Sequence, residues 1–143
     1  MKRKIYNEML LWKQNAQGKS ALMIDGARRI GKSYIVEEFA KNEYKSYILV
    51  DFNNADDNLI EIFDKYLRNL DVFFSYLALY YNVTLYPRDT VIVFDEVQLC
   101  PKARAAIKYL VKDGRYDYIE TGSLVSINRN VKDIVIPVGR TSY

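Results

Sequence analysis

The sequence has few of the residues on which most small catalytic and metal sites depend. Its 143 residues include one cysteine, Cys100, and no histidine. A single cysteine cannot form an intrachain disulfide, which excludes a disulfide-stapled secreted module. The absence of histidine excludes an ordinary zinc site, a Ser-His-Asp triad and a Cys-His dyad. Any chemistry must therefore use lysine, arginine, carboxylates and hydroxyl groups.

An excess of one charge and a long apolar run are also absent. Lysine and arginine number 21 against 18 acidic residues, a net charge of +3, which is too balanced to indicate nucleic acid. The most apolar stretch, 72–86, contains polar residues and falls short of the roughly 20 residues that span a bilayer. We therefore expect a soluble, cytoplasmic protein with no membrane partner and no strong indication of nucleic acid.

Strand and helix patterns alternate along the chain, whose length suits one domain. A helical pattern covers about 4–16, and a core follows from about 20 to 143. Apolar strand patterns lie at 20–25, 46–51, 91–94 and 116–120, and helical patterns at 33–41, 59–70, 72–82 and 101–112. This alternation predicts an α/β fold, a three-layer αβα sandwich with a mostly parallel central sheet.

A phosphate-binding motif follows the first strand pattern and opens the next helix. Residues 26–33 match Gly-x4-Gly-Lys-Ser, in which backbone N–H groups and the helix N-terminus surround an anion. Lys32 is expected to reach the outer phosphates, and the Ser33 hydroxyl to bind Mg²⁺. The alternative is a chance glycine turn with a surface lysine. The predicted phosphate-binding residues are Gly26, Ala27, Arg28, Arg29, Ile30, Gly31, Lys32, Ser33 and Tyr34.

Arg28 and Arg29 fit two interpretations. Their guanidinium groups would neutralise triphosphate charge if they faced the ligand, or would face solvent at the loop tip, which we favour.

Two carboxylates end the third strand pattern. Asp95 is placed to bind Mg²⁺, and Glu96 to orient and deprotonate a water that attacks the γ-phosphate. A solvated acidic pair at a strand end is the alternative. Gln98 lies two positions further on and is expected in the same cleft, whereas Cys100 is expected to be an inert buried thiol.

The turn after the fourth strand pattern carries hydroxyl groups. Thr121 and Ser123 flank Gly122, and either hydroxyl could bind the attacking water or the γ-phosphate. A plain Ser/Gly turn explains the same residues equally well.

These motifs give a resemblance that covers the chain. Residues 1–123 resemble the N-terminal ATPase domain of a bacterial and archaeal AAA-type ATPase family in the P-loop NTPase superfamily. The basic N-terminal helix with Trp12, the 26–33 loop, the 94–98 stretch and the 121–123 turn all fit.

The resemblance implies an ATP-binding ATPase with Mg²⁺ as cofactor. Lys32 and Ser33 would be phosphate and Mg²⁺ ligands, Asp95 and Glu96 the Walker B acids, and Thr121 or Ser123 the polar sensor. Gly139-Arg140 is a weak match to a Gly-Arg pair of the family. The family's fifth strand and lid are expected to be absent, so that 1–143 is an incomplete P-loop ATPase domain.

Three functions are consistent with these residues. The first is an ATP-hydrolysing switch or motor for an unidentified protein partner, with self-association open. The second is a nucleotide-binding adaptor with little hydrolysis, since an incomplete domain can lack a trans-acting arginine. The third is a small-molecule kinase, although no arginine-rich lid pattern is visible. The sequence has no guanine-specific Asn-Lys-x-Asp run, and no residue in it identifies the base. The preference for ATP therefore follows from the resemblance alone.

Overall fold

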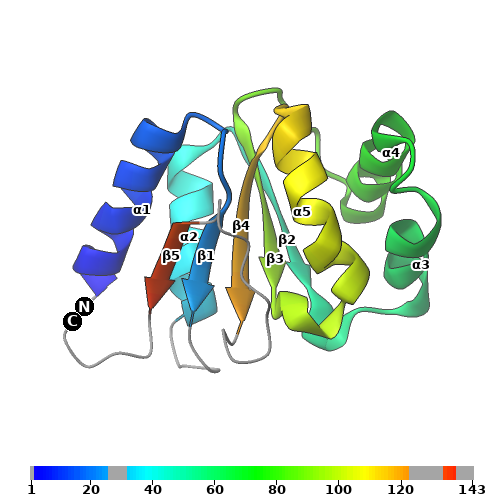
Figure 1. Ribbon diagram of the computed structural model, residues 1–143, viewed down its shortest axis with the longest axis horizontal. Helices are drawn as coiled ribbons and strands as arrows, with labels where there is room; N and C mark the ends of the chain where they lie inside the picture. The colour runs from blue at the N-terminus through cyan, green and yellow to red at the C-terminus, as the bar shows by residue number, and fades with distance from the viewer. Residues whose placement is uncertain (1, 26–31, 123–133, 138–143) are drawn as a thin grey trace.

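The computed structural model describes residues 2–25, 32–122 and 134–137 (Figure 1). Helices and strands alternate through most of this length. In chain order the elements are α1 (Lys2–Ala16), β1 (Leu22–Asp25), α2 (Lys32–Glu43), β2 (Ser46–Asp51), η1 (Phe52–Asn54), α3 (Asp57–Lys65), α4 (Leu70–Tyr81), β3 (Thr90–Asp95), η2 (Val97–Leu99), α5 (Pro101–Asp113), β4 (Asp117–Gly122) and β5 (Ile134–Pro137).

The strands form one parallel sheet in the order β2-β3-β4-β1-β5. All the carboxyl ends therefore lie at one edge, where the arrowheads of Figure 1 point. The predicted parallel α/β fold is confirmed. In this order β4 lies between β1 and β3. It is therefore the common neighbour of β1, which precedes the predicted phosphate motif, and of β3, which ends at Asp95.

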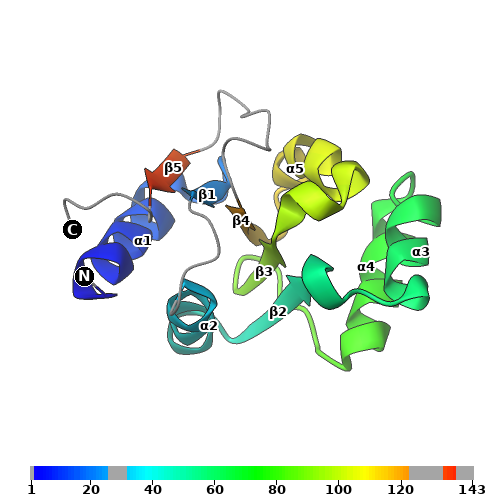
Figure 2. The same cartoon turned by 90° about the horizontal axis from the view of Figure 1, so that it is seen from below.

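Helices cover both faces of the sheet, as Figure 2 shows from below. Successive strand residues point to opposite faces, so alternate residues join different cores. Leu22 and Ile24 of β1 pack with α1 and α2, whereas Met23 packs on the face covered by α3, α4 and α5. Both faces of the central strands are apolar, which explains why these strands read as continuous hydrophobic runs rather than alternating ones.

The edge strand β5 is not among the strand patterns identified in the sequence. It pairs in parallel with β1 along its whole length. Pro137 stands at the last position of this edge strand. Proline is tolerated there because its missing N–H removes no central ladder bond.

The largest difference between the helical patterns and the observed helices lies between α3 and α4. The helical pattern at 59–70 ends early, at Lys65, and α4 begins at Leu70. The Asn69 side chain caps α4 by accepting a hydrogen bond from the Val72 backbone N–H at 3.4 Å. Within the described ranges, no helix is both long and apolar enough to cross a membrane.

Candidate functional site

The candidate site lies where the carboxyl ends of β1, β3 and β4 meet the start of α2. The register pairs Asp25 with Gly122 and Phe94 with Glu120, so the last residues of these three strands stand side by side. In open parallel sheets this edge is the usual location of bound ligands.

Ser33 and Asp95 are brought together across 62 positions of sequence. Ser33 is the second residue of α2, and its Oγ donates a hydrogen bond to Asp95 Oδ2 at 3.2 Å. Asp95 ends β3 and is largely buried, with 8% of its surface exposed. A hydroxyl and a carboxylate oxygen at this distance are the hard oxygen ligands that Mg²⁺ prefers.

Thr121 connects the two members of the acidic pair. Its hydroxyl is fully buried on β4, donates to Asp95 Oδ1, and accepts a hydrogen bond from the Glu96 backbone N–H at 3.1 Å. The sequence could not choose between a plain turn and a polar role at this position. The structure gives the hydroxyl two partners, Asp95 and Glu96, and so makes it part of the support for both acids.

Glu96 has an unusual backbone and a held side chain. Its φ of 56° and ψ of 50° lie in the left-handed region, which costs a residue other than glycine about 1–2 kcal/mol. The residue is 7% exposed, and Gln98 Nε2 donates a hydrogen bond to its Oε1 at 2.8 Å. Surrounding structure must hold such a conformation in place, a pattern common at functional sites.

The structure places only part of the predicted phosphate-binding set. Lys32 is the first residue of α2, and Tyr34 is 57% exposed on the same helix. The other predicted residues lie outside the described part of the chain. These are Gly26, Ala27, Arg28, Arg29, Ile30, Gly31 and Ser123, together with Gly139 and Arg140.

The sequence predicted one of two buried groups, the Cys100 thiol, and gave no prediction for the other, the Glu120 carboxylate. Burial raises the pKa of the Cys100 thiol, in line with the inert thiol that was expected. The fully buried Glu120, one residue before Thr121, was missed. It pairs with Arg104 of α5 at 3.2 Å between Nε and Oε1. Its signal in the sequence was a carboxylate at the end of the apolar strand pattern 116–120.

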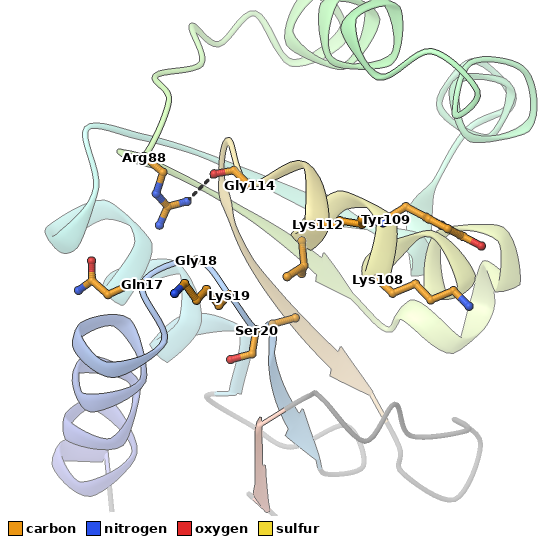
Figure 3. A pocket seen from close by; sticks show the side chains of 11 residues that line it. Gln17, Gly18, Lys19, Ser20, Arg88, Lys108, Tyr109, Lys112 and Gly114 are labelled. Carbon is orange, nitrogen blue, oxygen red and sulfur yellow. Dashed lines mark hydrogen bonds between the residues drawn. The ribbon is translucent and has the colours of Figure 1, made fainter.

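A separate basic pocket of about 730 Å³ lies at the amino ends of the strands, opposite the candidate site (Figure 3). It is lined by the turn before β1 and the end of α5, and its charged lining residues are all basic: Lys19, Arg88, Lys108 and Lys112. Because it adjoins the amino ends of β1 and β4, it is remote from the Ser33–Asp95 pair at their carboxyl edge.

Comparison with known proteins places the chain in a family. Residues 18–140 match the family model described as an AAA domain. The chain belongs to the AAA domain family. The match spans the candidate site from the segment before β1 to the end of the described sheet. The family implies nucleotide binding, typically with Mg²⁺.

Solved structures share the fold of this AAA domain, among them one from a nematode protein. The structure of C. elegans PCH-2 superposes with a TM-score of 0.58 at 15% sequence identity. The match covers 99% of this chain and 43% of that one, so the AAA domain spans less than half the length of PCH-2. No curated protein matches the sequence.

Proposed function

We propose that this AAA domain binds ATP with Mg²⁺ at the carboxyl edge of its sheet and hydrolyses the γ-phosphate, acting as a switch or motor for a protein partner. The Ser33–Asp95 hydrogen bond is the observation that carries the proposal. It joins the last residue of the predicted phosphate motif to the first of the predicted acidic pair. If the motif were a chance glycine turn and Asp95 a solvated acid, no hydrogen bond between them would be expected.

The residues present fit a magnesium site. Ser33 and Asp95 would hold Mg²⁺, the hydroxyl directly and the carboxylate through water, and the ion would neutralise charge on the phosphates. Lys32, which opens α2, would reach the outer phosphates. The positive end of the α2 dipole would add to the attraction.

The same geometry suits Glu96 to the role of general base. Glu96 follows Asp95 directly; its backbone N–H donates to Thr121, and its carboxylate accepts a hydrogen bond from Gln98. Glu96 would orient a water toward the γ-phosphate and accept its proton. Thr121 keeps the Asp95 side chain and the Glu96 backbone in fixed relation while the proton moves.

Calorimetric titration of ATP with and without Mg²⁺ tests the binding step. Lys32→Ala is expected to abolish Mg-ATP binding, because it removes the ammonium group that reaches the phosphates. Lys41→Ala is the matched control, since Lys41 is an exposed lysine in the last turn of the same helix. Equal affinity in both variants would contradict the proposed site.

Phosphate release tests the hydrolytic step. Glu96→Gln is expected to keep ATP affinity and to lose about 10²–10⁴-fold in turnover, the usual contribution of a general base. Tight ATP binding without release by the wild type would instead indicate the adaptor function. ATP consumption that requires an added acceptor would indicate the kinase.

A further inference from the structure

Gln98 is bound to Glu96 through its side chain. It lies in the short helix η2, directly after the acidic pair, and its Nε2 donates to Glu96 Oε1 at 2.8 Å. The reverse orientation of the amide would place two oxygen atoms against each other. The chemistry of the pair therefore assigns the donor to Gln98.

Glu96 is restrained at its backbone as well. Its N–H donates to Thr121 Oγ1 at 3.1 Å, and its carbonyl accepts from the Leu99 N–H at 3.0 Å. These bonds hold the left-handed conformation at φ 56°. With Gln98 holding the side chain, every segment of this residue from amide to carboxylate is anchored to a neighbour.

The second polar atom of Gln98 has no such partner. Its Oε1 is buried and makes no hydrogen bond in the described structure. A buried acceptor without a donor costs about 1–3 kcal/mol, so folded proteins seldom keep one without a reason. A water bound beside the Glu96 carboxylate would supply the missing donor.

We propose that Gln98 is a positioning residue for the water-activating carboxylate, its Nε2 fixing Glu96 and its Oε1 accepting a hydrogen bond from the attacking water. The inference rests on the proposed function, since it needs Glu96 to act as the base. Gln98 itself takes up no proton. Its contribution is to limit Glu96 and the water to one relative orientation.

Two substitutions separate this role from a packing role. Gln98→Met keeps the length and bulk of the side chain but has no N–H donor, and Gln98→Glu keeps the shape but replaces the donor with a like charge facing Glu96. Both are expected to lower kcat about 10- to 100-fold, the usual effect of losing a positioning partner. ATP affinity from calorimetry should stay unchanged, because Gln98 is not assigned to phosphate binding.

The matched control is Gln14→Met, which makes the same change at an exposed position of α1. It should leave both kcat and ATP affinity at wild-type values. Wild-type turnover in Gln98→Met would overturn the proposal. A higher turnover would also overturn it, because Gln98 would then be holding Glu96 away from the water.

A measurement without nucleotide keeps this inference distinct from the proposed function. The side-chain amide NMR signals of Gln98, identified by their loss in Gln98→Met, should shift and exchange faster with solvent in Glu96→Ala. They should not change in Glu61→Ala, which removes an exposed carboxylate from α3. Signals that do not respond to Glu96→Ala overturn the role of Gln98. If the signals respond to Glu96→Ala but the wild type does not hydrolyse ATP, the result contradicts the hydrolytic function and not the contact between Gln98 and Glu96.

Discussion

At the scale of single residues, Thr121 is the side chain on which the geometry of the acidic pair depends most. It is fully buried and serves two partners with one oxygen, donating to Asp95 and accepting from Glu96. Its removal would leave a carboxylate oxygen and a backbone N–H without their partner. Each such loss is more costly in the interior than at the surface.

Thr121→Val preserves the shape and deletes the hydroxyl. We expect it to lower the free energy of unfolding by about 1–3 kcal/mol, since buried polar groups lose their partner. Turnover should fall as well, because the Glu96 backbone is no longer held. Urea unfolding and phosphate release measure the two effects.

Thr121→Ser is the control, because it keeps the oxygen and loses only a methyl group. It should retain most of the turnover and most of the stability. If the valine and serine variants were equally impaired, the methyl group rather than the hydroxyl would be the important feature of Thr121.

At the scale of elements, Arg88 links three segments at the amino ends of the strands, opposite the candidate site. These are the loop before β3, which contains Arg88, the turn before β1 and the loop between α5 and β4. Its guanidinium donates to Gly114 O at 3.2 Å and pairs with Asp117 Oδ1 at 2.6 Å (Figure 3 shows the first of these). Asp117 in turn accepts a hydrogen bond from the Tyr44 hydroxyl at 2.5 Å. A Cβ at Gly18 would meet the guanidinium atoms at 2.6 to 2.7 Å, so this group leaves no room for a side chain there.

Gly18→Ala should disturb this junction. Gly18 has a φ of 79°, and a Cβ there would lie 2.6 Å from Arg88 Cζ, inside contact distance. We expect a loss of about 1–3 kcal/mol in the free energy of unfolding, from backbone strain together with displacement of a paired guanidinium. Urea unfolding of the wild type and the variant measures the loss.

Gly114→Ala is a matched control for the strain alone. Its φ of 82° is nearly the same, but the nearest atom to its Cβ would be Lys112 O at 3.8 Å, an ordinary contact. The difference between the two variants isolates the clash with Arg88. Equal losses would mean that Arg88 moves aside without cost.

At the scale of the whole molecule, we expect buried tyrosines to make the fold sensitive to alkali. Burial raises the pKa of Tyr44, with the Asp117 charge adding to the effect, and burial likewise raises the pKa of Tyr118. Burial, with a hydrogen bond to Glu37, raises the pKa of Tyr47 to about 12. In the unfolded chain these phenols ionise near pH 10, the ordinary value for tyrosine.

The sign of the resulting pH dependence follows from these shifts. A raised pKa in the folded state means that folding favours the neutral phenol, so its contribution is complete below about pH 10 and is lost as pH rises further. Above about pH 10, a buried phenol ionises in the unfolded chain but stays neutral in the folded protein. For each such phenol, the free energy of unfolding should fall by about 1.4 kcal/mol for every unit by which the pH rises.

Urea unfolding at a series of pH values measures this slope. The slope should be smaller in Tyr44→Phe, which has one such phenol fewer. A free energy of unfolding that stays level well above pH 10 would show that the buried phenols ionise without opening the fold.

Local patterns in the sequence determined much of this protein. The strands at 46–51 and 91–94, the helix after Pro101 and the order of phosphate motif and acidic pair are all readable, because they depend on near neighbours. Strand apolarity, helix periodicity and capping residues act over a few positions. The predicted roles of Lys32, Ser33, Asp95 and Glu96 follow from that order and remain predictions.

Tertiary structure alone decided which of these residues meet. Strand order is set by pairing between distant segments, so no local pattern could show that β4 would lie between β1 and β3 and bring Thr121 to Asp95. The pairing of β5 with β1 was hidden for the same reason, since a short segment ending in proline becomes a strand only when an open sheet edge accepts it. The hold of Gln98 on Glu96 likewise depends on a left-handed turn that the sequence does not display.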